Sequence, residues 1–401
     1  MSLIQKAFQA VKEGSFFSKV SAYLIASKRF YCLYNLCVPF IRVNENKIVC
    51  DNFVGSSYGD NPKYIAEEFL RQNKNADIVF LVERKKSSQY KFPSYVRTVP
   101  LYSVKHLYEM ASAKFWVFNY RKAIHLHKKQ NQFYIQTWHG SIGPKKCERA
   151  AENSLDKRYL WNAKKDSSQI SLCISGSSHL SRIYKEEFWY NGEILECGSP
   201  RNDILFNAKN LDVIKEKLNA KGKKICLYAP TFRNNHSLQS YGLDYFSLKS
   251  TLEQKFCGNW IVFLRLHPNM ADVDFGKLPD FIKNLSHYDD VQELLAVSDC
   301  LITDYSSIIY DFMLTRRPAF IFATDLKEYQ KNERNLYFSL DSTPFTLAEN
   351  NEELCESILN FNDEVYQTKI NEFAKRMNVF DDGHASERVV QWMMKKLEEK
   401  S

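Results

Sequence analysis

The chain has 401 residues, of which 44% are hydrophobic and 25% charged, and its formal net charge is +8 at pH 7. This length exceeds one ordinary hydrophobic core, so two domains are expected, and the composition excludes collagen-like, low-complexity and disordered proteins. No run of about 18 apolar residues occurs, which predicts no transmembrane helix, and no signal-peptide pattern opens the sequence.

Residues 1–43 predict a basic amphipathic helical segment. They carry six lysines and arginines against one glutamate, and apolar residues recur at helical spacing, as in Ile4, Phe8 and Val11. An anionic membrane surface would attract such a segment, although a helical pair packed on the first domain explains the same pattern. No helix-turn-helix, zinc finger or RNA-binding motif accompanies the charge, so we expect no nucleic-acid partner.

Ten cysteines are scattered along the chain without any CxxC pair. Several lie inside apolar runs, as in "SLCIS", which is typical of reduced cysteines that pack as small hydrophobic residues. We therefore expect a cytoplasmic protein without a zinc site.

Strands and helices alternate through residues 44–205. Apolar runs predict strands at 47–55, 76–83, 114–120, 132–138, 169–175 and 193–198. Helical patterns lie between them at 61–73, 104–112 and 177–189. Apolar strands separated by helices are typical of a parallel sheet that is covered on both faces.

A second alternation follows a polar helical stretch at 204–222, which we expect to connect two domains. Strands are predicted at 223–230, 259–268, 299–307 and 318–324, within a second domain that spans 206–380. Residues 350–399 read as helical, and 381–401 are expected to form a C-terminal amphipathic helix. The predicted fold is α/β, with two Rossmann-like doubly wound domains facing a cleft in which a nucleotide-like ligand binds.

Polar side chains follow the ends of several predicted strands, which is where open α/β sheets place their ligand chemistry. In "QTWHGSIGPKK" the strand is followed by His139 and then by Lys145 and Lys146. The corresponding residues elsewhere are Arg201 in "CGSPRND", Pro230, Thr231 and Arg233 in "LYAPTFR", Arg265 and His267 in "FLRLHPN", and Thr303, Ser306, Ser307 and Asp311 in "CLITDYSSIIYDF".

Each residue type in this set suits a phosphate ligand. Arginine matches two phosphate oxygens with its planar fork, a protonated histidine donates to phosphate, and a helix start with serines offers free N–H groups. Each motif alone also has a structural explanation: a loop histidine, a solvated charge or an ordinary helix N-cap. The recurrence of such groups at the same topological place favours the functional explanation.

In this order and spacing the five motifs resemble the CDP-glycerol glycerophosphotransferase family of teichoic acid and capsule-polymer synthesis. The resemblance covers about residues 45–380. It implies a GT-B fold, no metal requirement, an acceptor domain at 44–205 and a CDP-donor domain at 206–380.

The resemblance also implies roles for individual residues. His139 corresponds to the general base, and Arg265 and His267 would stabilise the pyrophosphate and the departing CMP. Ser306 and Ser307 would hold phosphate, and Asp311 would reach glycerol or ribose hydroxyls. Further donor contacts are expected from Trp138, Gly140, Ser141, Ile142, Arg201, Pro230, Thr231, Arg233 and Thr303, and phosphate contacts on acceptor or donor from Lys145 and Lys146.

One departure concerns the loop after His139. The common family form continues with Thr-Pro-Leu and a lysine, whereas Ser141-Ile142-Gly143-Pro144 precedes Lys145 here. The loop is therefore one residue longer or turns differently, which bears on the identity of the acceptor.

The expected function is transfer of glycerol phosphate, or ribitol phosphate, from a CDP-alditol to a lipid-linked primer or growing polymer, with release of CMP. We expect no cofactor and a peripheral position at the cytoplasmic face of the membrane. The sequence does not determine the oligomeric state, and a homo-oligomer is compatible with it. Two alternatives stay open: a GT-B nucleotide-sugar or sugar-phosphate transferase, and a catalytically silent lipid- or polyanion-binding scaffold.

Overall fold

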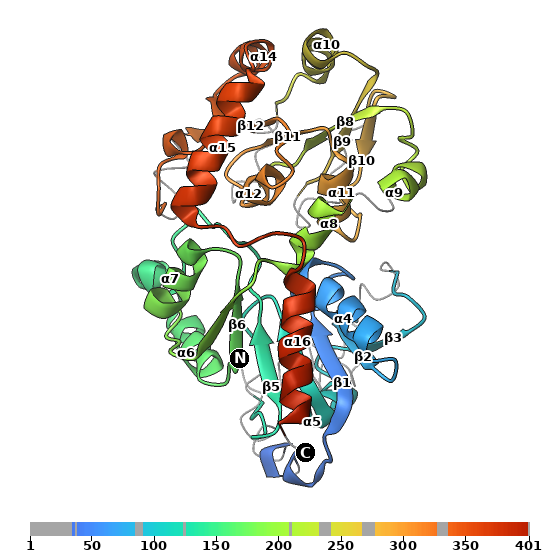
Figure 1. The fold of residues 1–401 in the computed structure, drawn as a ribbon, viewed down its shortest axis with the longest axis vertical. Coiled ribbons are helices and arrows are strands. Elements are labelled where there is room, and N and C mark those ends of the chain that lie inside the picture. The colour runs from blue at the N-terminus through green and yellow to red at the C-terminus, as the bar shows by residue number, and fades with distance from the viewer. Residues whose placement is uncertain are drawn as a thin grey trace, which may run out of the picture.

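The computed structural model describes residues 34–36, 38–84, 91–122, 126–207, 211–231, 242–266, 277–326 and 336–399. These residues form two parallel β-sheets, one above the other along the long axis, each covered by helices (Figure 1). The predicted basic segment at 1–43 lies almost entirely outside the described residues. Within the described part of the chain, no helix is long and apolar enough to cross a membrane.

The first sheet has seven parallel strands in the order β3-β2-β1-β4-β5-β6-β7. Their bounds are β1 Asn44–Asp51, β2 Asp77–Val82, β3 Val96–Pro100, β4 Ala113–Phe118, β5 Phe133–Gln136, β6 Leu172–Ser175 and β7 Glu193–Glu196. Its helices are α4 Asp60–Gln72, α5 Val104–Ser112, α6 Lys157–Ser167 and α7 Ser178–Glu187, with 3-10 turns η1 Val38–Phe40, η2 Glu148–Ser154 and η3 Pro200–Asn202.

The second sheet has six parallel strands in the order β10-β9-β8-β11-β12-β13. Its strands are β8 Lys224–Tyr228, β9 Trp260–Leu264, β10 Ile282–Asn284, β11 Cys300–Thr303, β12 Ala319–Phe322 and β13 Thr346–Ala348. Its helices are α10 Tyr245–Phe256, α11 Val291–Val297, α12 Ile308–Met313, α14 Asn351–Leu359 and α15 Asp363–Met377, with a 3-10 turn η6 Leu340–Ser342.

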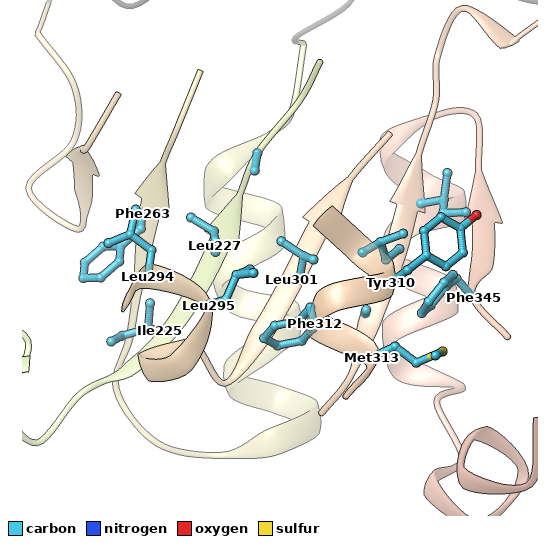
Figure 2. Close-up of a cluster of buried hydrophobic side chains, with 14 of the residues drawn as sticks. Ile225, Leu227, Phe263, Leu294, Leu295, Leu301, Tyr310, Phe312, Met313 and Phe345 are labelled. Carbon is cyan, nitrogen blue, oxygen red and sulfur yellow. The ribbon is translucent and has the colours of Figure 1, made fainter. Parts of the chain in front are cut away.

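Each sheet has a hydrophobic cluster on both faces, as a parallel sheet requires. On the second sheet, α11, α12 and α15 cover one face, and α10 and α14 cover the other. Figure 2 shows Leu295 of α11 and Phe312 of α12 beside the strand residue Leu301, and all three are fully buried. The predicted doubly wound architecture is confirmed by these layers and by the strand orders.

The chain passes between the two halves twice. After β7 it runs through two short helices, α8 Asp203–Phe206 and α9 Leu211–Lys217, which occupy the stretch expected to connect the domains. After α15 it returns, and α16 Ala385–Glu398 packs beside α4 on the first sheet (Figure 1). Val389, Val390 and Met393 of α16 are fully buried in the first sheet's cluster, so the C-terminal helix is part of the first half.

Candidate active site

A cavity of about 430 Å³ lies between the two sheets, where the carboxyl ends of their strands meet. We call it the central cavity. Residues from both halves line it, and those used below are Asn52, Phe53, Asp60, His139, Arg201, Pro230, Thr231, Arg265, Ser306, Ser307 and Asp311. Most of these residues follow a strand or begin the next helix, which is the expected ligand position of an open parallel sheet.

His139 lies just beyond the end of β5, and its ring is fixed by one hydrogen bond. Nδ1 lies 2.8 Å from the backbone carbonyl oxygen of Asn119. Because a carbonyl oxygen only accepts, Nδ1 carries the proton and Nε2 keeps its lone pair. The neutral imidazole is therefore held in the tautomer that a general base needs.

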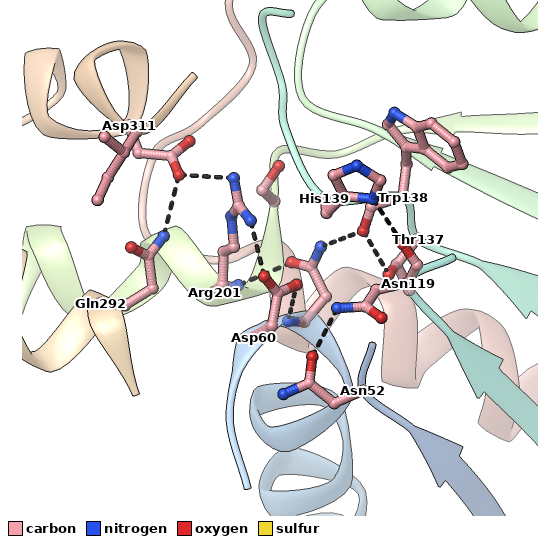
Figure 3. A network of polar contacts seen from close by, with 12 residues as sticks. Asn52, Asp60, Asn119, Thr137, Trp138, His139, Arg201, Gln292 and Asp311 are labelled. Atoms are coloured by element: carbon pink, nitrogen blue, oxygen red, sulfur yellow. Dashed lines mark hydrogen bonds and ion pairs between the residues drawn. The ribbon is translucent and has the colours of Figure 1, made fainter. Parts of the chain in front are cut away.

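The surroundings of His139 favour this neutral form. Burial lowers its pKa below the usual 6.5, against the opposing effect of the Asn119 carbonyl. The ring also lies against Trp138, with a centroid separation of 4.3 Å (Figure 3). On another side it lies 5.2 Å from the ring centroid of Phe53. The imidazole is thus available to accept a proton at neutral pH.

The turn that carries His139 is held by side chains on either side of it. Trp138 has a positive φ of 52°, which is uncommon for a residue with a side chain. Its N–H donates to Oε1 of Gln136 at 2.9 Å, and its carbonyl accepts from Nδ2 of Asn61 at 3.2 Å. These bonds stabilise a backbone conformation that would otherwise be unfavourable.

Asn119 also connects His139 to the loop after β1. Its Nδ2 donates to Oδ1 of Asn52 at 2.7 Å (Figure 3). Its Oδ1 accepts from the N–H of Phe53 at 3.0 Å. Asn52 in turn donates to the carbonyl of Ser57 at 3.1 Å. Asn119 therefore orients the imidazole of His139 and also holds the loop after β1, which forms one wall of the cavity.

Arg201 forms a buried bridge between the halves. Nη1 donates to Asp60 at 2.7 Å and Nη2 donates to Asp311 of α12 at 2.6 Å (Figure 3). Burial opposes the charge, but the two carboxylates outweigh it and hold the pKa of Arg201 above its usual range. Because two carboxylates neutralise its charge, Arg201 lines the cavity but provides no excess positive charge to a ligand.

Asp311 was expected to reach glycerol or ribose hydroxyls. The structure engages both carboxylate oxygens with protein groups: Oδ2 accepts from Arg201 and from Gln292 at 3.2 Å, and Oδ1 accepts from Asn202 at 3.3 Å. Asp311 is 3% exposed. Asp311 therefore acts in the bridge between the halves.

Arg265 has a different environment, at the end of β9. Its Nη1 donates to the carbonyls of Leu285 at 3.1 Å and Tyr288 at 2.5 Å, neither of which carries a charge. Burial lowers its pKa to about 10, which still leaves it protonated at neutral pH. Arg265 is the cation in this cavity best placed to bind phosphate bidentately.

The ends of β8 and β11 are joined through Asp304. The N–H of Thr231 donates to Oδ1 of Asp304 at 2.9 Å and its hydroxyl donates to Oδ2 at 3.0 Å. Thr303 is fully buried and donates to the carbonyl of Ala229 at 2.6 Å. Pro230 and Thr231 thus line the cavity, whereas Thr303 supports their backbone from behind.

Ser306 and Ser307 line the cavity at the start of α12, as the sequence predicts. The Ser307 hydroxyl makes no capping hydrogen bond to its own helix. A Cβ placed on Gly140 would lie 3.5 Å from Oγ of Ser307. The loop after His139 and the start of α12 therefore approach each other across the two halves.

The other residues of the His139 loop lie away from the cavity. Ser141 is 4% exposed and its Oγ lies 2.5 Å from Oγ of Ser199, while Ile142 is 2% exposed within the cluster of the second sheet. The backbone of Lys145 pairs with Leu336 in an isolated antiparallel β-bridge. Neither Lys145 nor Lys146 lines the central cavity. Ser141 and Ile142 were expected to contact the donor, and Lys145 and Lys146 to contact phosphate of the acceptor or donor. None of these four side chains lines the central cavity.

Arg233 and His267 lie outside the described residues. Among the described residues, no group of three or more His, Cys, Asp and Glu side chains is arranged to hold a metal ion.

Several residues of the site were not predicted. Asn52, Phe53 and Asn119 follow the ends of β1 and β4, so the same strand-end argument could have found them. Asp60 and Gln292 carry no local motif. The packing of α4 and α11 at the interface between the two halves brings Asp60 to Arg201 and Gln292 to Asn202 and Asp311.

Comparison with known proteins gives consistent results. A poly(glycerol phosphate) polymerase of teichoic acid from Staphylococcus epidermidis is 32% identical over 92% of this chain and 53% of its own length. One from Bacillus spizizenii is 29% identical over 91% of this chain and 96% of its own length. A solved structure of the wall teichoic acid polymerase TagF has a TM-score of 0.81 at 29% identity and covers all of both chains.

The chain spans about half the length of the Staphylococcus epidermidis relative. The family model described as CDP-glycerol:poly(glycerophosphate) glycerophosphotransferase matches residues 31–395, which include every strand and helix of both sheets up to α16. The chain therefore belongs to the CDP-glycerol:poly(glycerophosphate) glycerophosphotransferase family, with the GT-B type of fold.

Proposed function

We propose that this protein transfers glycerol phosphate from CDP-glycerol to a hydroxyl of a polyol-phosphate polymer or its primer, and releases CMP. The observation that carries the proposal is His139, held neutral with Nε2 as its basic nitrogen, in the same cavity as Arg265. Membership of the family and the relatives named as poly(glycerol phosphate) polymerases support the choice of substrates.

In the proposed step, Nε2 of His139 takes the proton of the acceptor hydroxyl as its oxygen attacks the β-phosphorus of CDP-glycerol. A new phosphorus–oxygen bond forms, and the bond from that phosphorus to the bridging pyrophosphate oxygen breaks. CMP departs with the electron pair. The bound product is a phosphodiester, and His139 is left protonated in an environment that lowers its pKa.

The second half would hold the donor. Arg265 offers to the pyrophosphate guanidinium N–H groups that no described residue engages, and Ser306 and Ser307 add hydroxyls beside it. Positioning and charge stabilisation provide most of the catalysis in phosphoryl transfer, so this set suffices chemically. His267 and Arg233 remain predicted donor contacts.

The test is nucleotide release by the purified protein, measured as CMP from CDP-glycerol or CDP-ribitol and as UDP from UDP-glucose. Each donor is tried with and without a glycerol-phosphate primer, in the presence of a chelator. We expect primer-dependent release from CDP-glycerol. CMP release from CDP-ribitol alone would show that ribitol phosphate is the transferred group. UDP release from UDP-glucose alone would favour a nucleotide-sugar transferase. A requirement for added Mg²⁺ would contradict the metal-independent reaction that we propose.

The acceptor is proposed to be lipid-linked, with the protein bound peripherally at the cytoplasmic membrane face. The basic residues of 1–43 support this because anionic headgroups attract clustered lysines by about 1 kcal/mol each. Co-sedimentation with phosphatidylglycerol vesicles should be strong, and replacement of Lys6, Lys12 and Lys19 by glutamate should abolish it. Equal sedimentation of both proteins would contradict the role of this segment.

A further inference from the structure

A second cavity, of about 480 Å³, lies at the seam between the halves and shares no lining residue with the central cavity. We call it the lateral cavity. It is bounded by the start of α7, by residues 337–342 and by the end of α15. Its charged lining residues are Arg182 and Arg376, and no aspartate or glutamate of the described chain lines it.

Among the described residues, the side chain that hydrogen-bonds Arg182 is a buried histidine. Nε2 of His179 lies 3.4 Å from the carbonyl of Gly143 and therefore donates to it, which leaves Nδ1 to accept from Nη2 of Arg182 at 3.5 Å. His179 is 7% exposed, and burial lowers its pKa, so it is neutral here. The charge of Arg182 is thus not neutralised by this partner.

Arg376 lies on the opposite wall. Its Nη2 donates to the backbone carbonyl of Ser342 at 2.5 Å, and its guanidinium lies 4.9 Å from the ring centroid of Phe373. Both partners are uncharged. The lateral cavity therefore presents two guanidinium groups held by neutral partners, which is an arrangement suited to an anion with several oxygens.

The lateral cavity is connected to the catalytic histidine by a short piece of chain. Gly143, whose carbonyl positions His179, follows His139 by four residues, so the Cα atoms are at most about 14 Å apart. The same loop continues to Pro144, whose carbonyl accepts from the N–H of Tyr337 at 2.6 Å, and Tyr337 lines the lateral cavity. One loop thus forms part of both sites.

From this geometry we infer that the lateral cavity is a subsite for a phosphodiester of the acceptor chain, one or more units behind the hydroxyl that reaches His139. The inference rests on the proposed function, because an acceptor made of phosphodiester-linked units would carry an anion in each unit behind its reacting hydroxyl. The two arginines would bind the phosphodiester oxygens. The loop from His139 to Pro144 would fix the distance along the acceptor polymer between this phosphodiester and the reacting hydroxyl.

The test compares acceptors with one and with several glycerol-phosphate units, using Arg182→Gln and Arg376→Gln. We expect the acceptor KM of the longer primer to rise about tenfold in each variant, as for loss of one charge-assisted hydrogen bond. The KM for CDP-glycerol and kcat should be unchanged, and the single-unit primer should be unaffected. An equal rise for both primers, or no rise, would overturn the subsite.

Arg158→Gln is the matched control, since Arg158 is an exposed arginine of α6 that lines neither cavity. It should behave as the unchanged protein with both primers. Equal melting temperatures of all three variants would show that the effects are not caused by unfolding.

Direct binding separates this inference from the proposed function. A soluble glycerol-phosphate oligomer, titrated by calorimetry without donor, should bind the unchanged protein and lose affinity in Arg182→Gln. Binding without any turnover of CDP-glycerol would refute the proposed reaction and leave the anion site standing. If Arg182→Gln instead loses binding to phosphatidylglycerol vesicles and keeps oligomer binding, the surface contacts the membrane and the subsite is wrong.

Discussion

His139, the proposed general base, differs in its partner from histidines that are held by a carboxylate. The group that fixes its Nδ1 proton is a backbone carbonyl, at 2.8 Å, and not a carboxylate. A carboxylate would stabilise the imidazolium and raise the pKa, whereas a carbonyl mainly orients the ring. The site therefore selects the tautomer while burial keeps the ring neutral, which suits a base that must be unprotonated before each turnover.

This environment predicts the pH dependence of the reaction. Because burial lowers the pKa of His139 below 6.5, the base stays neutral as the pH falls from 8 to 6.5 and becomes protonated only below that. We expect kcat to be flat over this range and to fall with an apparent pKa under 6.5. A pH profile of kcat checks this, and an acid limb centred above 6.5 would contradict it. His384→Gln, at an exposed histidine, should leave the profile unchanged.

At the scale of elements, the loop after β5 is held against the turn between β6 and α7. A Cβ on Gly176 would lie 2.2 Å from Oγ and 2.7 Å from Cβ of Ser141. No side chain fits there unless the loop moves, since the contact involves the first atoms of a short side chain. Gly176 therefore sets how closely the loop can approach.

Gly176→Ala should destabilise the protein by about 1–3 kcal/mol, as overpacking of a tight contact does. It should also lower activity, because the displaced loop carries His139. Gly143→Ala is the matched control, since a Cβ placed on Gly143 would meet no atom within 4 Å. Urea unfolding and CMP release measure both effects, and equal behaviour of the two variants would contradict this view of the loop.

The loop after β1 depends on the pair Asn52 and Asn119, whose side chains are joined at 2.7 Å. Asn52→Ala and Asn119→Ala should each lower the free energy of unfolding, and the double variant should lose less than the sum by about 1 kcal/mol. A double-mutant cycle of urea unfolding measures this coupling. Strict additivity would show that the two residues act independently.

The central strands of both sheets could be predicted from the sequence because they are apolar runs between helical patterns. The edge strands β3, β10 and β13 were not predicted. They have three to five residues, and β3, for example, carries the half-exposed Arg97 and ends at Pro100. Such segments become strands because a neighbouring strand supplies hydrogen bonds, which no local pattern encodes.

The same distinction applies to the site. Residues such as His139, Arg265 and Ser306 were predicted because they follow strands. The ion pairs of Arg201 were not predicted, because they depend on residues such as Asp60, which is 141 positions away. The burial of Ser141 and Ile142 was not predicted either, because it depends on Ser199 and on the cluster of the second sheet. Only the packing of one half against the other reveals these roles.

At the scale of the whole molecule, charged residues connect the two halves. Lys63 of α4 lies 2.7 Å from Asp290 and 2.8 Å from Glu293, and Arg201 lies between Asp60 and Asp311. These pairs are largely buried, so removing one partner leaves a charge without compensation. The relative position of the halves, and hence the shape of the central cavity, depends on them.

Arg201→Met should lower the free energy of unfolding by about 3–5 kcal/mol, because Asp60 and Asp311 are left buried without their cation. Adding Asp311→Asn to the same chain should recover part of this loss by removing one of the two charges. Chemical denaturation of the two variants tests the bridge. A loss under about 1 kcal/mol for Arg201→Met would show that the bridge contributes little.

The most direct test of the account compares donor binding with turnover in His139→Gln. CDP-glycerol should bind this variant with a Kd within about threefold of the original protein, because we propose that the second half holds the donor. Primer-dependent CMP release should fall by about 10²–10⁴. That result would place the base at His139, in the cavity between the two sheets. Undiminished CMP release by the variant would contradict the central claim.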